Sequence, residues 1–181
     1  KEDFKENSCY GYFSTPFIDG VHRSHDYDVE AGVLKNETVF IGYSNKQYLG
    51  CFNYWELLYK NREPELFDNL KLLLEKLGGY TGPLNIECID NIIIECHLRR
   101  GDSSLIKDHD KPFYMVPIWG NIYDDDDIDV ESLKEQDGVI DVIKDDNNLS
   151  KTGISIQRKG LVLTKLLPDD FKYSCNECVN I

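Results

Sequence analysis

Residues 82–102, GPLNIECIDNIIIECHLRRGD, constrain the fold more than any other stretch of this sequence. Two short apolar runs flank the dipeptide Asp90-Asn91, and polar side chains alternate with apolar ones along both runs. Alternation with a period of two is typical of β-strands that bury one face. The stretch therefore predicts a β-hairpin, and the carboxylate on each of its strands, Glu87 and Glu95, needs an explanation.

The register of this hairpin decides which side chains meet. A two-residue turn would place Glu87 and Glu95 on opposite faces of the sheet. A three-residue turn at 90–92 pairs Glu87 directly with Glu95, and the same register pairs Asn85 with His97. A slip of one residue turns every side chain of a strand to the other face, so the burial of one apolar face fixes the register. Only the three-residue turn lets the apolar faces of both strands coincide, and we predict that turn.

This register brings two like charges together. Carboxylates directly opposite each other on paired strands have Cβ atoms about 4.5–5.5 Å apart, and they repel unless a cation lies between them or one takes up a proton. A bridging Mg²⁺ would remove the repulsion, and Arg99, on the same face as His97, would then steer a phosphate. The alternative is that Glu87 and Glu95 face solvent on an exposed sheet face, with Arg99 or Arg100 neutralising them.

A second hairpin is predicted nearer the N-terminus. Within residues 13–34, Tyr27 and Val29 alternate with acidic residues, which indicates a strand. The segment KNE, 35–37, is predicted to form a tight turn, and TVFIGYS, 38–44, to form the return strand.

Residues 61–79 give the clearest helical pattern. Pro64 suits a first helical turn, leucines repeat at helical spacing, and Gly78 suits the end of the helix. The apolar stripe is expected to pack against a sheet.

The remaining segments predict further strands and one short helix. The aromatic segment 111–123 is interrupted by two prolines and is predicted to be an edge strand or a loop. An acidic run leads into a short helix near 130–136, and strands are predicted within 138–146 and 153–168. This order indicates an α+β fold, an antiparallel sheet with flanking helices.

We expect two regions, 1–110 with the main sheet and helix, and 111–181 as a C-terminal extension packed on the same domain.

Charge and cysteine content limit the function classes. The chain is acidic, with a net charge of −13 from 33 acidic and 20 basic residues, so binding to phosphate backbones of nucleic acids is not expected. No run approaches the roughly 18 apolar residues of a membrane span. The spacing of the six cysteines does not form a dense disulfide framework, and the single CxxC, Cys175 and Cys178, lacks a second pair for structural zinc. We expect Cys88 and Cys96 to be small buried apolar residues in a reduced, cytoplasmic protein.

The stretches quoted above resemble the metal-binding end of the ATP-grasp fold. That family carries a Glu or Asp on one strand, then Glu-x-Asn on the next, often followed by Arg. Here NIECI supplies Glu87, and IIECHLR supplies Glu95, with His97 at the position of the Asn and Arg99 at that of the Arg. The upstream order, from PFIDGVHRSHDYDVEAGVLKNETVFIGYS through the leucine-rich helix to GYTGPLNIE, is similar too. The resemblance covers about residues 15–102.

This resemblance implies a ligase that uses ATP and Mg²⁺ to join a carboxylate to an amine or thiol through an acyl-phosphate. Glu87 and Glu95 would hold Mg²⁺ on the nucleotide phosphates, and His97 would be a weak further ligand in contact with the cofactor. Arg99 would be the catalytic residue, contacting the phosphates of ATP or of the acyl-phosphate. The implied partners are ATP, a small-molecule or peptide carboxylate substrate, and an N-terminal chain or segment with the phosphate-binding lysines and Gly-rich loop.

The alternative is a non-catalytic scaffold or interaction protein, a pseudoenzyme that keeps the fold and binds a partner through the aromatic segment 111–123. Three other histidines, His22, His25 and His109, have no evident chemical partner in the sequence, and we assign them no role.

Overall fold

The computed structural model describes residues 18–44, 51–106, 109–121, 128–145 and 156–166. The strands are β1 (His22–Glu30), β2 (Val33–Ser44), β3 (Phe52–Arg62), β4 (Gly82–Ile89), β5 (Ile92–His97), β6 (Tyr114–Asn121), β7 (Val139–Lys144) and β8 (Ile156–Thr164). The helices are α1 (Asp68–Lys76), α2 (Val130–Lys134) and the 3₁₀ helix η1 (Asp102–Leu105).

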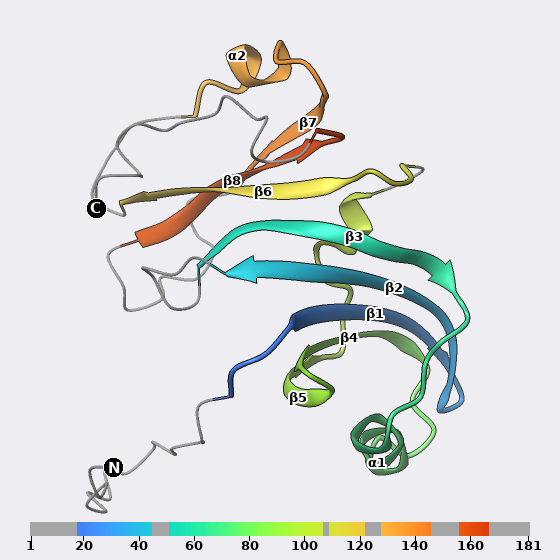
Figure 1. The fold of residues 1–181 in the computed structure, drawn as a ribbon. Coiled ribbons are helices and arrows are strands. Elements are labelled where there is room, and N and C mark those ends of the chain that lie inside the picture. The colour runs from blue at the N-terminus through green and yellow to red at the C-terminus, as the bar shows by residue number, and fades with distance from the viewer. Residues whose placement is uncertain (1–17, 45–50, 107–108, 122–127, 146–155, 167–181) are drawn as a thin grey trace, which may run out of the picture.

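All eight strands belong to one antiparallel sheet, in the order β5-β4-β1-β2-β3-β6-β8-β7. Figure 1 shows that the sheet is curved, with α1 below β4 at one end and α2 beside β7 at the other. The predicted α+β fold, an antiparallel sheet with flanking helices, is confirmed. Strands β6, β8 and β7 continue the same sheet, and the division into regions 1–110 and 111–181 stays a prediction.

The first hairpin forms, but its predicted turn at 35–37 is wrong. The chain turns at Ala31 and Gly32, with φ angles of 48° and 80°, and residues 35–37 lie within β2. A two-residue turn with both residues at positive φ matches the twist of paired strands, and glycine adopts that conformation without a steric cost. Tyr27 and Val29, predicted to share a face with Ala31 and Val33, are buried on β1. Ala31 lies in the turn and Val33 begins β2, where it is exposed.

The β4–β5 hairpin has a different turn from the predicted one, yet the predicted carboxylate pairing. Asp90 and Asn91 form a two-residue turn with φ angles of 47° and 68°, so the three-residue turn is wrong. A β-bulge then places Ile94 as an extra residue in β5, between the pairs Cys88↔Ile93 and Glu87↔Glu95. The bulge restores the register that the turn would have shifted.

Strand β5 is the last strand of the sheet, and this changes the burial predicted for it. Ile92, Ile94 and Leu98 are all more than two-fifths exposed. Cys88 on β4 is buried as predicted, whereas Cys96 on β5 is exposed. An edge strand has a neighbour on one side only, so its apolar side chains are covered less completely. Cys175 and Cys178 lie outside the described residues.

The helix predicted over 61–79 is shorter than expected. Strand β3 continues to Arg62, and α1 begins at Asp68. Sequence reasoning missed β3 altogether, and in the structure this strand pairs with β2 and β6. The predicted end of the helix is confirmed, since Gly78 follows it with a φ of 57°.

The aromatic segment 111–123 is not an edge strand or loop over most of its length. It forms β6, which lies between β3 and β8. Phe113, Tyr114 and Met115 are almost completely buried. Pro117 lies opposite Leu161 in an inner strand, a position from which proline is usually excluded because it donates no ladder hydrogen bond. The short helix near 130–136 and the strands within 138–146 and 153–168 are confirmed as α2, β7 and β8.

The face of the sheet under α1 is an apolar core with one buried charge. Tyr27, Leu84 and Leu70 of α1 are fully buried there. Glu37 is also completely buried, and its carboxylate accepts hydrogen bonds from Tyr27 Oη at 2.9 Å and from Arg62 Nε.

A third partner of Glu37 is His25, whose Nδ1 lies 2.8 Å from Oε1. Burial alone would raise the pKa of the Glu37 carboxyl, but the hydrogen bonds from His25, Arg62 and Tyr27 outweigh it and lower the pKa from 4.5 to about 2. Burial and the Glu37 charge raise the pKa of the Tyr27 phenol, which stays a donor.

We expect Glu37 to make the stability of the protein depend on acid. Its pKa is lower in the folded chain than its ordinary 4.5, so the stabilisation is complete above pH 4.5 and is lost as the pH falls towards 2. The loss amounts to at most about 3 kcal/mol. Urea unfolding of wild type and Glu37→Gln between pH 6 and pH 2 measures it. The variant should be less stable at pH 6 and less sensitive to pH, and parallel pH profiles would contradict this role.

Candidate functional site

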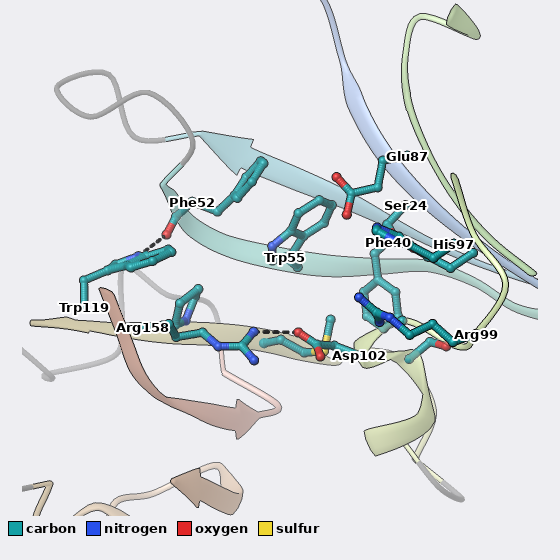
Figure 2. A pocket seen from close by; sticks show the side chains of 15 residues that line it. Ser24, Phe40, Phe52, Trp55, Glu87, His97, Arg99, Asp102, Trp119 and Arg158 are labelled. Atoms are coloured by element: carbon teal, nitrogen blue, oxygen red, sulfur yellow. Dashed lines mark hydrogen bonds and ion pairs between the residues drawn. The ribbon is translucent and has the colours of Figure 1, made fainter. Parts of the chain in front are cut away.

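A pocket of about 280 Å³ opens on the face of the sheet opposite α1 (Figure 2). Strands β1, β2, β3, β4, β5, β6 and β8 contribute to it, and the segment 98–106 closes one side. Its lining residues are Ser24, Phe40, Phe52, Trp55, Asn85, Glu87, His97, Arg99, Gly101, Asp102, Ser103, Met115, Pro117, Trp119 and Arg158.

Strand pairing brings the polar residues of this pocket together. Glu87 lies between Ser24 of β1 and Glu95 of β5, and Asn85 lies opposite His97. Since partners directly opposite each other share a face, these side chains stand on the pocket side of the sheet. The predicted meeting of Glu87 and Glu95 is therefore present in the strand register.

Each carboxylate of this pair has a histidine beside it. Glu87 Oε2 lies 3.0 Å from His22 Nε2, and Glu95 Oε1 lies 3.2 Å from His97 Nε2. The Glu87 side chain is 25% exposed and lines the pocket, whereas Glu95 is 54% exposed and lies outside the lining. The pair thus spans the rim of the pocket. Sequence reasoning gave His22 no role, and its contact with Glu87 depends on β1 pairing with β4.

Arg99 follows β5 on the segment 98–106, which crosses the pocket side of the sheet. Buried Asp26 of β1 holds this segment by accepting hydrogen bonds from the Gly101 N–H at 2.8 Å and from the Ser103 hydroxyl. A Cβ on Gly101 would lie 2.8 Å from Asn85 Nδ2, so the close approach requires glycine. Arg99 itself is exposed and donates to the carbonyl of Arg100.

A second arginine of the pocket comes from the far end of the chain. Arg158 of β8 contacts Asp102 of η1 through Nη1 at 2.6 Å (Figure 2). Its Nε also lies 2.6 Å from Asp145. These two carboxylates keep the guanidinium charged and raise its pKa although burial opposes it. Sequence reasoning missed Arg158 and Asp102, because only the pairing of β8 with β6 brings them beside the hairpin.

The structure thus gathers three of the four predicted site residues, Glu87, His97 and Arg99, in the lining of one pocket, with Glu95 beside them. Within the described residues, no group of three or more His, Cys, Asp or Glu side chains is arranged to hold a metal ion. A pair of carboxylates still suits Mg²⁺, which usually takes one or two carboxylates and completes its shell with water and phosphate oxygens. Their metal-binding role stays a prediction.

Comparison with known proteins gives a fold likeness without a sequence match. No protein-family model and no curated protein matches the chain. The structure is similar to an L-amino acid ligase from Bacillus licheniformis, with a TM-score of 0.53 and 17% identity over 90% of this chain and 49% of that one. It is also similar to a phosphoribosylaminoimidazole carboxylase ATPase subunit from Aquifex aeolicus, with a TM-score of 0.51 and 14% identity over 83% of this chain and 52% of that one.

The fold is ATP-grasp-like. This confirms the resemblance predicted from the sequence, and at these identities the likeness concerns the fold. The chain spans about half the length of each of the two proteins. Among the described helices, none is both long and apolar enough to cross a membrane.

We expect Asp26 to hold the segment that carries Arg99. In Asp26→Ala, the Gly101 N–H and the Ser103 hydroxyl would both lose their acceptor, and a polar group left unpaired inside the protein costs on the order of 1–3 kcal/mol. Amide hydrogen exchange at Gly101 should then become faster by about tenfold or more. The control is Glu30→Ala at the exposed end of the same strand. Unchanged exchange at Gly101 in Asp26→Ala would show that the segment is held by other contacts.

Proposed function

We propose that this chain is the C-terminal portion of an ATP-grasp-like ligase that joins a carboxylate to an amine or thiol through an acyl-phosphate made with ATP. In this proposal the pocket rim formed by Glu87 and Glu95 binds Mg²⁺ with the nucleotide phosphates, and Arg99 contacts the phosphoryl oxygens. The observation that carries it is the direct pairing of Glu87 with Glu95 beside a pocket that Arg99 also lines.

The charges of the site support this assignment. Two carboxylates opposite each other on paired strands repel, and a divalent cation bound between them removes this repulsion. The neighbouring imidazoles of His22 and His97 occupy one oxygen of each carboxylate, which leaves the other oxygen to face a cation. His97 is the weaker candidate ligand, because imidazole prefers transition metals.

Catalysis would rest on position and charge. When bound, Mg²⁺ would neutralise charge on the phosphate oxygens during phosphoryl transfer. Glu87 and Glu95 would fix the position of the phosphates relative to the pocket. Arg99 would direct N–H donors at the phosphoryl or acyl-phosphate oxygens, where a planar guanidinium can bind two oxygens at once. Asp26, through Gly101 and Ser103, would hold the segment that positions Arg99.

The alternative is a non-catalytic protein that keeps the fold. It is favoured by one observation, that within the described residues an imidazole is the only ion-pair partner of each carboxylate and no third acidic ligand joins them. The interaction surface predicted for this alternative is the segment 111–123, but its residues Phe113, Tyr114, Met115 and Ile118 are buried within the sheet, which does not support it.

Paramagnetic broadening by Mn²⁺ in place of Mg²⁺ separates the two functions. With Mn²⁺ and ATP, we expect the NMR signals of the backbone amides at 85–88 and 94–99 to broaden before others, since Mn²⁺ accepts the same oxygen ligands. Titration of this broadening gives an apparent affinity for Mn²⁺. Glu87→Gln and Glu95→Gln should each weaken that affinity about tenfold, a loss of ~1.4 kcal/mol.

The control variant is Glu131→Gln, an exposed carboxylate on α2. It should leave the broadening at the β4–β5 hairpin unchanged. Broadening that is absent from the hairpin, or that persists in both hairpin variants, would contradict a nucleotide–metal site there and favour the non-catalytic protein.

A further inference from the structure

One end of the pocket is aromatic. Phe52 and Trp55 of β3 lie with ring centroids 4.3 Å apart, and Trp119 of β6 donates from Nε1 to the Phe52 carbonyl at 2.8 Å. All three line the pocket and are half-buried. Figure 2 shows them together on one side, with His97 and Arg99 on the other. We call Phe52, Trp55 and Trp119 the aromatic wall.

The aromatic wall depends on a glycine in the neighbouring strand. Gly42 of β2 lies opposite Trp55, and a Cβ placed on it would come within 2.8 Å of ring atoms of both Trp55 and Phe52. Real Cβ atoms do not approach neighbours so closely, so any side chain at this position would displace the rings. Gly42 therefore lets both rings pack closely against β2.

The aromatic wall adjoins the charged end of the pocket through His22. The imidazole contacts Phe52 and Trp55 edge-on, at centroid distances of 4.9 Å and 5.2 Å, and its Nε2 lies 3.0 Å from Glu87. A ligand that touched both the aromatic wall and the Glu87 end would thus be a small molecule with an apolar part and a polar part.

At the polar end, Arg99 is the side chain that could bind an anion. Arg158 is already held by Asp102 and Asp145. Arg99 has no carboxylate within salt-bridge distance in the described part of the chain, and its guanidinium borders the pocket. A carboxylate is the planar anion that a guanidinium binds through two parallel hydrogen bonds.

We propose that this pocket binds the carboxylic acid substrate of the reaction, an acid of amino-acid size whose aromatic or branched apolar tail lies against the aromatic wall and whose carboxylate faces Arg99. This deepens the proposed function and rests on it. The volume of about 280 Å³ falls just below the roughly 300–1,000 Å³ of sites for drug-sized ligands, so the pocket suits such an acid and is too small to hold a nucleotide as well.

Intrinsic fluorescence tests this directly, because Trp55 and Trp119 are the two tryptophans of the chain and both line the pocket. The probes are 3-phenylpropionate and propionate, titrated without ATP or metal. We expect 3-phenylpropionate to change the tryptophan emission and to bind at least about tenfold more tightly than propionate, since burial of its ring removes apolar surface from water. Equal affinity, or no change in emission with either acid, would overturn the proposal.

Two variants separate the two halves of the pocket. Gly42→Ala should weaken 3-phenylpropionate by about tenfold and leave propionate unchanged, because only the aromatic wall moves. Arg99→Gln should weaken both acids by a similar factor, since both present the same carboxylate. Tyr59→Ala, an exposed aromatic of β3 that lines no part of the pocket, is the matched control and should change neither.

The outcomes distinguish this inference from the proposed function. Selective acid binding together with Mn²⁺–ATP broadening at the β4–β5 hairpin supports both. Loss of acid selectivity with the broadening retained overturns the subsite alone. Selective acid binding without any nucleotide effect leaves an acid-binding pocket and overturns its assignment to a ligase. The wild-type comparison of the two acids needs no substitution, so it decides the matter even if Gly42→Ala does not fold.

Discussion

The site depends on how β4 pairs with its two neighbours. A two-residue turn at Asp90 and Asn91 would by itself separate the carboxylates onto opposite faces, and the bulge at Ile94 returns Glu87 and Glu95 to the same one. A bulge adds one residue to one strand and so reverses the alternation beyond it. The place of His97 opposite Asn85, on the pocket side of the sheet, also follows from this single extra residue.

The same strands have different chemistry on their two faces. Towards α1, β1 and β4 bury Tyr27 and Leu84, and the charge of Glu37 is balanced by hydrogen bonds. Towards the pocket, β1 presents Ser24 and Asp26, which are in register with the polar residues of β4. The buried face provides stability, while the pocket face holds like charges and a tethered segment that a bound ligand would stabilise further.

Local patterns predicted the elements better than their boundaries. Alternation around Glu87 and Glu95 was sufficient to predict their pairing, because only one register buries a single face. The turn could not be predicted, since a short turn with a bulge and a longer turn give the same pairing. Strand β3 and the inner place of β6 depend on long-range pairing, which in β6 includes Pro117. The contacts of Arg158 with residues far away in the chain could not be predicted from the local sequence.

In the proposed site, the paired carboxylates share a divalent cation with nucleotide phosphates. A crystal structure of the chain with Mn²⁺ and a non-hydrolysable ATP analogue tests this most directly, because anomalous scattering locates the metal. We expect a peak within coordination distance of one carboxylate oxygen each of Glu87 and Glu95, close to the roughly 2.0–2.1 Å typical of Mg²⁺. A peak elsewhere on this acidic protein, or carboxylates that still bind only His22 and His97 in the presence of metal and nucleotide, would contradict it.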